Sequence, residues 1–268
     1  MSDQDVYTHG HDDSVLRSHR WRTAQNSAGY LLGHLRPGLS LLDVGCGPGT
    51  ITADLARLVA PGRTLGIEPV EDPLAEARAA GAGITTLEFA VADVYALDPG
   101  AGRYDVVHAH QVLQHLTDPV AALRAMGSVL APGGVVAVRD ADYAAMTWYP
   151  ADDRLDAWLA TYRAVARSNG ADPDAGRKLH AWARQAGFTE VTASASVWLY
   201  TTPDERAWWG GLWADRITTS RVAQQAVERG IASASELAEM AAGWRAWAAD
   251  PDGWFTVPNG EVLARAPR

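Results

Sequence analysis

Cysteine and lysine are almost missing from this sequence of 268 residues, which contains only Cys46 and Lys178 of these types. One cysteine cannot form a disulfide within the chain or supply the cysteine clusters of structural zinc sites. No stretch approaches the run of about 18 apolar residues that a membrane-spanning helix needs. The start of the chain is polar and acidic and lacks the apolar core of a secretory signal, so we expect a cytoplasmic protein.

Basic residues are outnumbered by acidic ones, with 23 Lys and Arg against 32 Asp and Glu, so the formal net charge is −9 at pH 7. Nucleic-acid binding depends on clustered Lys and Arg, so this balance argues against a nucleic-acid partner, although a local basic patch is compatible with a negative total. Apolar residues make up 47 % of the chain, which is enough for a sizeable core. The sequence gives no indication of the oligomeric state.

A glycine-rich segment, LLDVGCGPGT (41–50), follows an apolar stretch and precedes a helical pattern. This order predicts a strand that turns sharply into a helix, with Gly45, Gly47 and Gly49 in the turn. Glycine tolerates the φ values of a tight turn and lets a ligand approach the backbone, and the free N–H groups of the helix start point toward it. The third glycine comes one position earlier than in the dinucleotide fingerprint, which favours a cofactor without a pyrophosphate.

Strand and helix patterns alternate from residue 39 to about 140, which predicts an α/β fold with a doubly wound parallel sheet. Strands are expected at 39–44, 64–67, 85–91, 104–109 and 135–139, and helices at 50–60, 73–80 and 118–130. Two longer strand patterns, 189–199 and 255–265, predict antiparallel final strands that complete a seven-stranded sheet. We expect an N-terminal arm and helices over residues 1–38 and one domain over 39–268, with helical cap inserts at about 144–172 and 203–249.

Polar side chains stand at the ends of the expected strands, at Asp43, Glu68, Asp93, Gln111 and Asp140. Ligands of open parallel sheets bind at the carboxyl ends of the strands. Glu68 comes nineteen residues after Gly49, where a carboxylate can accept hydrogen bonds from both hydroxyls of a ribose. Asp93 is placed to receive the exocyclic amine of an adenine. The pattern therefore predicts a cofactor that contains adenosine.

Together these motifs resemble class I S-adenosylmethionine-dependent methyltransferases, and the most similar branch is named for ubiquinone and menaquinone biosynthesis. The resemblance rests on LLDVGCGPGT (41–50), GIE (66–68), VADV (91–94), YDVVHAHQVLQHL (104–116) and LAPGGVVAV (130–138). It covers about residues 25–140 and is weak outside them. It implies the Rossmann-like methyltransferase fold, S-adenosylmethionine as the cofactor and S-adenosylhomocysteine as its product.

For the methionine end of the cofactor, the resemblance implies that Gly45 and Gly47 face it and that Gln111 lies near it. Asp43 would either orient the glycine loop or meet the cofactor amine. Arg22 precedes the first strand, in a helix that packs over the cofactor in this family. A charge-assisted pair between Arg22 and the cofactor carboxylate is expected, and a solvated helix arginine is the alternative.

For the nucleoside end, the resemblance implies that Glu68 binds the ribose and that Asp93 and Val94 hold the adenine. Many relatives have Asp where Glu68 stands, and the longer side chain still reaches a ribose. An NAD-binding or inactive nucleotide fold is the alternative for the whole set of motifs.

The catalytic chemistry depends on whether the acceptor must lose a proton to a base. Methyl transfer from a sulfonium is an in-line displacement with a neutral leaving group, so alignment supplies much of the rate. His110, His115 and Asp142 are the candidate bases near the strand ends. A structural role is the alternative for His115, and a role in the sheet is expected for His108. Asp140 and Asp142 lack a recognisable third oxygen ligand, so no metal is expected.

Aromatic residues gather late in the chain, where ten of the eleven tryptophans lie from Trp148 onward. The candidates for the substrate pocket are Tyr7, His11, Tyr143, Trp148, Trp209 and Trp213. At least one of Trp148, Trp208, Trp209 and Trp213 should line the pocket, since aromatic walls suit a flat or sulfur-rich acceptor. The alternative is that these tryptophans form the core of a helical cap.

The sequence favours an enzyme that methylates a small molecule. The N-terminal pattern and the tryptophan-rich inserts also resemble microbial methyltransferases of secondary metabolism, some of which methylate the thiols of reduced dithiols. A thiol can ionise without help, so S-methylation agrees with the lack of an unambiguous base. The alternatives are an O- or N-methyltransferase of a phenolic, quinol or amine metabolite with a His or Asp base, and a relative that binds the cofactor without methyl transfer.

Overall fold

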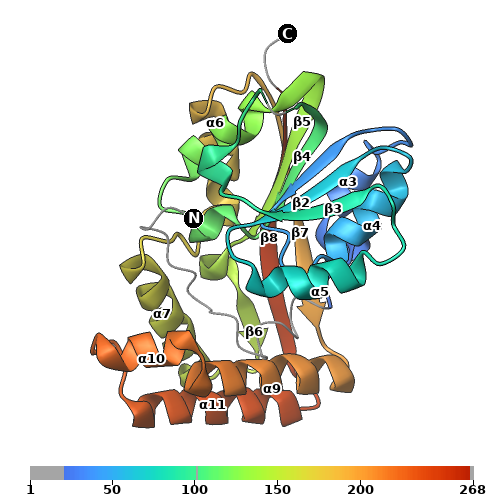
Figure 1. The fold of residues 1–268 in the computed structure, drawn as a ribbon. Helices are drawn as coiled ribbons and strands as arrows, with labels where there is room; N and C mark the ends of the chain where they lie inside the picture. Colours follow the sequence, from blue (N-terminus) through green and yellow to red (C-terminus); the bar gives the residue numbers. More distant parts are fainter. Residues whose placement is uncertain (1–20, 101, 266–268) are drawn as a thin grey trace.

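The computed structural model describes residues 21–100 and 102–265, and it confirms the α/β doubly wound architecture (Figure 1). The strands are β1 (Leu41–Val44), β2 (Thr64–Glu68), β3 (Leu87–Val91), β4 (Tyr104–His110), β5 (Leu130–Ala141), β6 (Thr147–Tyr149), β7 (Glu190–Tyr200) and β8 (Trp254–Arg265). They pair in the order β3-β2-β1-β4-β5-β8-β6, with β7 on β8. Strands β1 to β5 are mutually parallel, and β8 runs antiparallel to β5, β6 and β7.

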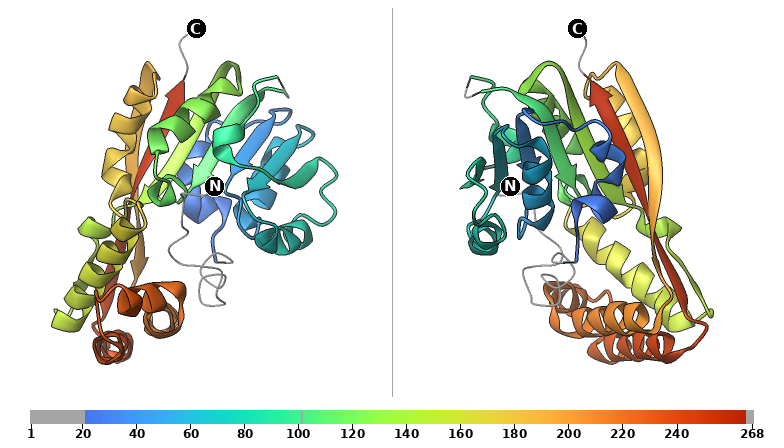
Figure 2. Two further views of the ribbon diagram at one scale, coloured as in Figure 1. Left: turned by 60° about the vertical axis from the view of Figure 1, so that its left-hand side comes forward. Right: turned by 90° about the vertical axis from the view of Figure 1, so that its right-hand side faces the viewer.

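Helices cover the sheet and build a separate layer at one end. They are α2 (Ala24–Ser27), α3 (Gly29–Leu32), α4 (Thr50–Val59), α5 (Asp72–Ala80), α6 (Pro119–Ser128), α7 (Asp153–Ser168), α8 (Leu179–Gln185), α9 (Pro203–Thr219), α10 (Arg221–Glu228) and α11 (Ala234–Ala249). Both views of Figure 2 show β7 and β8 running from the parallel part of the sheet to the layer of α9, α10 and α11. We call α7, α9, α10 and α11 the cap. In the described part of the chain, no helix is long and apolar enough to cross a membrane.

The strand β6 corrects the expectation of a purely helical first insert. Its three residues pair antiparallel with β8, from Thr147 opposite Thr256 to Tyr149 opposite Trp254. Threonine and aromatic side chains suit a pleated, half-buried surface, and the partner strand β8 is long enough to receive them. Within the described residues the sheet therefore has eight strands, where the sequence predicted seven.

The strand β5 is longer than predicted because its glycine-rich start belongs to the strand. Residues 132–134 were expected to end the preceding helix, yet α6 already ends at Ser128 and β5 begins at Leu130. The register with β4 shifts between Tyr104 and Val106, and Gly133 has a φ of 79°. The Pro-Gly-Gly segment is thus accommodated as an irregularity in the pairing.

The cap has its own aromatic core, and local signals fix where its helices begin. Thr202 and Glu205 form a capping box at α9, and Ser233 and Glu236 form another at α11. Trp158, Trp213, Trp244 and Trp247 are among the largest fully buried side chains of the described chain. The ring centroids of Trp158 and Trp213 are 4.6 Å apart, and those of Trp158 and Trp244 are 4.7 Å apart, both edge-on. These four tryptophans therefore belong to the core of the cap.

Two glycines let the 3-10 helix Ala175–Lys178 lie directly on β8. A Cβ atom built on Gly260 would lie 1.9 Å from the carbonyl oxygen of Gly176, and one built on Gly176 would lie 2.7 Å from the carbonyl oxygen of Asp140. Both obstacles are backbone atoms, which cannot rotate away. This contact fixes the segment before α8 against the carboxyl end of β5.

We expect Gly260→Ala to lower the free energy of unfolding by about 1–3 kcal/mol or more, because the methyl group overpacks a backbone contact. Gly211→Ala is the matched control: Gly211 lies inside α9, and a Cβ there meets nothing within 4 Å. Alanine is favoured over glycine in a helix by about 1 kcal/mol, so the control should be neutral or stabilising. Urea denaturation followed by circular dichroism measures both, and equal stability of the two variants would contradict the expectation.

Candidate active site

One cavity of about 410 Å³ opens where the carboxyl ends of the parallel strands meet the cap. The predicted site residues that line it are Arg22, Asp43, Gly45, Gly47, Glu68, Val94, His110, Gln111, His115, Tyr143 and Trp209. The predicted residues Asp93, Asp142, Trp148 and Trp213 are not in its lining. Tyr7 and His11 lie outside the described residues.

The glycine loop wraps around one end of this cavity. Gly45, Gly47 and Gly49 have φ angles of 66°, 52° and 75°, a region that other residues rarely adopt. A Cβ on Gly45 would lie 2.5 Å from the side chain of Val112, so this position has no room for a larger residue. The N–H groups of Gly45 and Cys46 donate to the carbonyl of Ile67, which ties the loop to the end of β2.

Glu68 ends β2 and lies against the glycine loop. Its carboxylate accepts a hydrogen bond of 2.9 Å from the N–H of Gly47. Burial raises the pKa of Glu68 to about 7, with a smaller raising effect from the charge of Asp43, and the bond from Gly47 acts in the opposite direction. The residue therefore presents a carboxyl group to the cavity whose ionisation changes near neutral pH.

Both carboxylate oxygens of Asp43 are held by neighbours. One oxygen is 2.7 Å from Nδ1 of His108 on β4, and the other accepts a bond of 2.5 Å from the hydroxyl of Thr52 on α4. All three side chains are buried. These contacts connect β1, β4 and α4 around the glycine loop, so they favour the first of the two roles predicted for Asp43, which is to orient the loop. They also give His108 a partner within the sheet.

At the nucleoside end, the adjacent residues Asp93 and Val94 differ in their surroundings. The carboxylate of Asp93 accepts a 3.0 Å bond from the N–H of Tyr95 and caps the short 3-10 helix Val94–Ala96. Ala92 and Val94 line the cavity, whereas Asp93 does not. An apolar contact with the adenine is therefore the part of the prediction that this arrangement supports best.

The side chains of Arg22 and Gln111 contact each other beside the carboxyl ends of the parallel strands. Arg22 Nη2 donates to Gln111 Oε1 at 2.6 Å, and Gln111 Nε2 donates to Asn259 on β8 at 3.3 Å. Gln111 has a φ of 53°, in the left-handed region that glycine usually occupies. Strained backbone of this kind is common at functional sites, where surrounding bonds hold it. The N–H of Gln111 is fixed by the carbonyl of Arg139 at 2.7 Å.

Of the three candidate bases, His110 and His115 line the cavity. Burial, and to a smaller degree the positive charge of Arg22, lowers the pKa of His115 to about 3. An imidazole with so low a pKa is neutral at pH 7 but takes up a proton poorly. His110, the last residue of β4, lies with its ring centroid 5.7 Å from that of Trp198.

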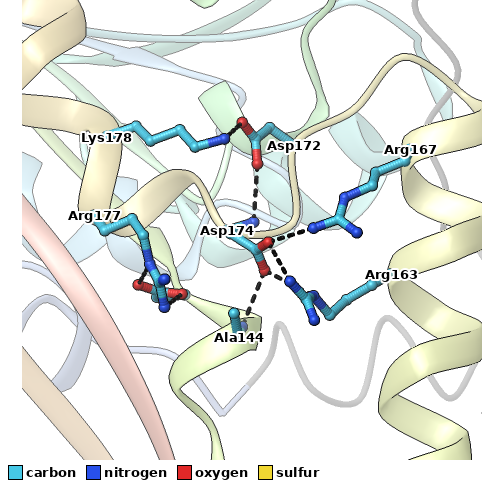
Figure 3. Close-up of polar contacts among 8 residues, drawn as sticks. Ala144, Arg163, Arg167, Asp172, Asp174, Arg177 and Lys178 are labelled. Atoms are coloured by element: carbon cyan, nitrogen blue, oxygen red, sulfur yellow. Dashed lines mark hydrogen bonds and ion pairs between the residues drawn. The ribbon is translucent and has the colours of Figure 1, made fainter.

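Asp142 serves as an anchor beside the cavity. Its two carboxylate oxygens accept bonds of 2.5 and 2.8 Å from Arg177. The same segment holds Asp174, which accepts bonds from Arg163, Arg167 and the N–H of Ala144 (Figure 3). This network fastens the chain between α7 and α8 to the end of β5. In the described part of the chain, no cluster of three His, Cys, Asp or Glu side chains is arranged to hold a metal ion.

The other end of the cavity is aromatic and cationic. Trp209 and Tyr200 are stacked with ring centroids 4.5 Å apart, and Trp198 and Trp208 also line this end. Trp213 lies one helical turn beyond Trp209, but it is fully buried inside the cap. Trp148 packs on Phe255 at 5.7 Å in the same core. Of the four tryptophans of which at least one was expected to line the pocket, Trp208 and Trp209 line the cavity, whereas Trp148 and Trp213 do not.

Several residues of the cavity were not predicted from the sequence: Trp21, Trp198, Tyr200, Arg216 and Arg221. Trp198 and Tyr200 alternate along β7, so a period of two placed them on one face and could have indicated a shared role. Arg216 lies seven residues after Trp209 on α9, which is about two helical turns. That spacing could have indicated the same face of the helix.

Comparison with known proteins establishes the family. The family described as "Methyltransferase domain" matches residues 16–193, and the chain belongs to it. Together with the fold, this makes the protein a class I S-adenosylmethionine-dependent methyltransferase. The residue roles within the site remain predictions.

The relatives differ in how much of the chain they match. An uncharacterized methyltransferase of Schizosaccharomyces pombe is 32% identical, with 98% of this chain and 97% of the relative covered. A ubiquinone biosynthesis O-methyltransferase of Cereibacter sphaeroides is 36% identical over only 37% of this chain and 40% of its own. Among solved structures, the YcgJ protein of Bacillus subtilis has the same fold, with a TM-score of 0.57, 15% identity and coverage of 90% and 98% of the two chains.

If Glu68 binds the ribose as predicted, cofactor binding should strengthen as the pH rises through about 7, because the ionised carboxylate accepts hydrogen bonds from the ribose hydroxyls and its proton is lost only near this pH. At pH 6 about a tenth of the side chains would be ionised, so the Kd for S-adenosylhomocysteine should be about tenfold weaker than at pH 8. Isothermal titration calorimetry at several pH values measures this trend.

Glu68→Gln should weaken binding and remove the pH trend, because the amide does not titrate. Glu71→Gln is the control, since Glu71 is an exposed carboxylate that pairs with Arg78 and is absent from the cavity lining. The control should keep the trend. A trend that persists in Glu68→Gln would assign it to another group.

Proposed function

We propose that this enzyme transfers the methyl group of S-adenosylmethionine to a thiol of a small molecule. The observation that carries the proposal is that two of the three candidate bases, Asp142 and His115, are poorly suited to accept a proton from the acceptor. Asp142 is engaged by Arg177 and does not line the cavity, and the pKa of His115 is lowered to about 3. An acceptor that ionises near neutral pH without a protein base fits such a site, and a thiol has a pKa of about 8.5.

The chain's own residues would bind and align the two reactants. In this proposal, the glycine loop and Glu68 would hold the cofactor at one end of the cavity, and Arg22 would bind the cofactor carboxylate. Trp208, Trp209 and Tyr200 would hold the acceptor at the opposite end. When bound, the cofactor supplies a methyl group on a positively charged sulfur, which becomes a neutral thioether.

The transfer needs alignment more than acid–base chemistry. A lone pair of the acceptor sulfur forms the new carbon–sulfur bond while the bond between the methyl group and the sulfonium breaks, and the thiol proton goes to water. Well-aligned reactants can gain several kcal/mol from orientation alone. Rigid aromatic walls and the fixed backbone of Gln111 suit this task.

O-methylation with His110 as the base is the second candidate. His110 lines the cavity at the end of β4, where it could take the proton of a phenol or quinol. The ubiquinone biosynthesis O-methyltransferases that match part of the chain add support to this candidate.

The deciding experiment combines purified protein with isotopically methyl-labelled S-adenosylmethionine and a panel of acceptors. The panel holds monothiols, dithiols, phenols, quinols, carboxylates and amines, with tRNA and a protein extract as controls, and mass spectrometry locates the label. We expect label on sulfur. Label only on oxygen or nitrogen would overturn S-methylation, and label only in the macromolecules would overturn a small-molecule acceptor.

One variant, measured beside a control variant, separates S-methylation from O-methylation. His110→Gln should lower kcat for a thiol less than about tenfold, whereas loss of a general base costs about 10²–10⁴-fold. A larger loss with unchanged affinity for S-adenosylhomocysteine would favour the O-methylation candidate. Trp254→Ala is the matched control, because Trp254 is an exposed aromatic residue of β8 that is absent from the cavity lining.

A further inference from the structure

Charge is unevenly distributed along the cavity. Among the described residues of its lining, the carboxylates are those of Asp43 and Glu68, which both belong to the cofactor end, on β1 and β2. Arg216 and Arg221 line it from α9 and α10, in the cap. A cofactor bound at the glycine loop therefore has these acidic side chains beside it. Apart from Arg22, which is predicted to bind the cofactor carboxylate, the arginines of the described lining belong to the acceptor end.

Arg216 is held firmly in the cavity wall. The residue is only 4% exposed, and its guanidinium carbon lies 4.7 Å from the ring centroid of Trp213. Trp213 is itself stacked on Trp244 in the cap core, with centroids 6.1 Å apart. A guanidinium on an aromatic face keeps its donors in a fixed plane, which suits bidentate binding of a carboxylate.

Arg216 also acts on the same part of the cavity as the expected acceptor. Its positive charge and that of Arg22 both counteract the raised pKa of Tyr143, which is caused by burial, so both cations lie near this phenol. Tyr143 lines the cavity, and Trp208 and Trp209 lie two turns before Arg216 on the same helix. A flat ring between the aromatic walls would thus have a cation within reach.

We propose that the acceptor is an aromatic thiol that carries a carboxylate, and that Arg216, assisted by Arg221, binds this carboxylate. The thiol part of the statement rests on the proposed function, and the carboxylate part rests on the arginines. Arg216 is buried, and a buried cation attracts an anion more strongly than it attracts a neutral group. Arg221 is exposed, so its contribution is smaller, and Arg216 is the main determinant of specificity at the acceptor end.

The first test measures binding without turnover. Protein saturated with S-adenosylhomocysteine is titrated with 2-naphthoate and with the neutral 2-naphthalenemethanol, and calorimetry gives both Kd values. We expect the anion to bind at least about tenfold more tightly and this preference to weaken with added salt. Arg216→Met should abolish the preference, Arg221→Gln should reduce it, and Arg216→Lys should retain part of it because the charge remains.

A matched control variant and a check of folding accompany this binding test. Arg245→Gln removes an exposed arginine of the cap helix α11 that is absent from the cavity lining, and it should keep the full preference. Circular dichroism checks that each variant is folded. If Arg216→Met does not fold, Arg216→Lys and Arg221→Gln decide. Equal binding of the two ligands, or a preference unchanged in every folded arginine variant, overturns the proposal.

The second test uses 4-mercaptobenzoate and 4-methylthiophenol as acceptors and separates the two proposals. Faster methylation of the acid, with kcat/KM for the acid reduced in Arg221→Gln and reduced more strongly in Arg216→Met, supports both. Methylation of both thiols at the same rate overturns the carboxylate site and leaves S-methylation standing. Preferential binding of the acids with no methylation of any thiol overturns S-methylation and leaves the carboxylate site standing.

Discussion

The position of the acceptor end depends on one strand, β8. Its later residues pair with β5, the last of the parallel strands, from Asn259 opposite Ala141 to Ala264 opposite Val136. Its first residues pair with β6 and with the end of β7, where they carry Phe255 into the aromatic core of the cap. A single continuous hydrogen-bonded strand thus sets the distance between the two walls of the cavity. Figure 1 shows β8 running from the parallel strands to the helices below them.

The cofactor end of the site could be predicted because its residues are local in the sequence. A turn that contains Gly45, Gly47 and Gly49 needs its residue types at fixed spacing, and the strand ends place Glu68 and Gln111 beside it. The same logic did not predict the contacts of Asp93 with the N–H of Tyr95 and of Asp142 with Arg177, because a carboxylate can bind a backbone N–H or an arginine as well as a ligand. Which partner it takes depends on contacts with residues far away in the chain, such as Arg177.

The acceptor end could not be predicted in the same way, because long-range packing assembles it. Trp209 and Trp213 share a face of α9 by spacing, and both belong to the core of the cap, yet of these two only Trp209 also lines the cavity. The difference comes from the neighbours that each ring meets: Tyr200 on β7 stacks on Trp209, while Trp158 on α7 packs against Trp213. No pattern within α9 contains this information.

Arg22 connects the two ends of the cavity in a way that has thermodynamic consequences. It donates to Gln111, and its charge also acts on His115, Tyr143 and Tyr200. S-adenosylhomocysteine lacks the positive sulfur of the cofactor, so if its carboxylate neutralises the charge of Arg22, the field at the acceptor end becomes less positive. Linkage then requires that an anion at the acceptor end and S-adenosylhomocysteine weaken each other's binding by the same factor. Such negative coupling would favour dissociation of one product while the other is still bound.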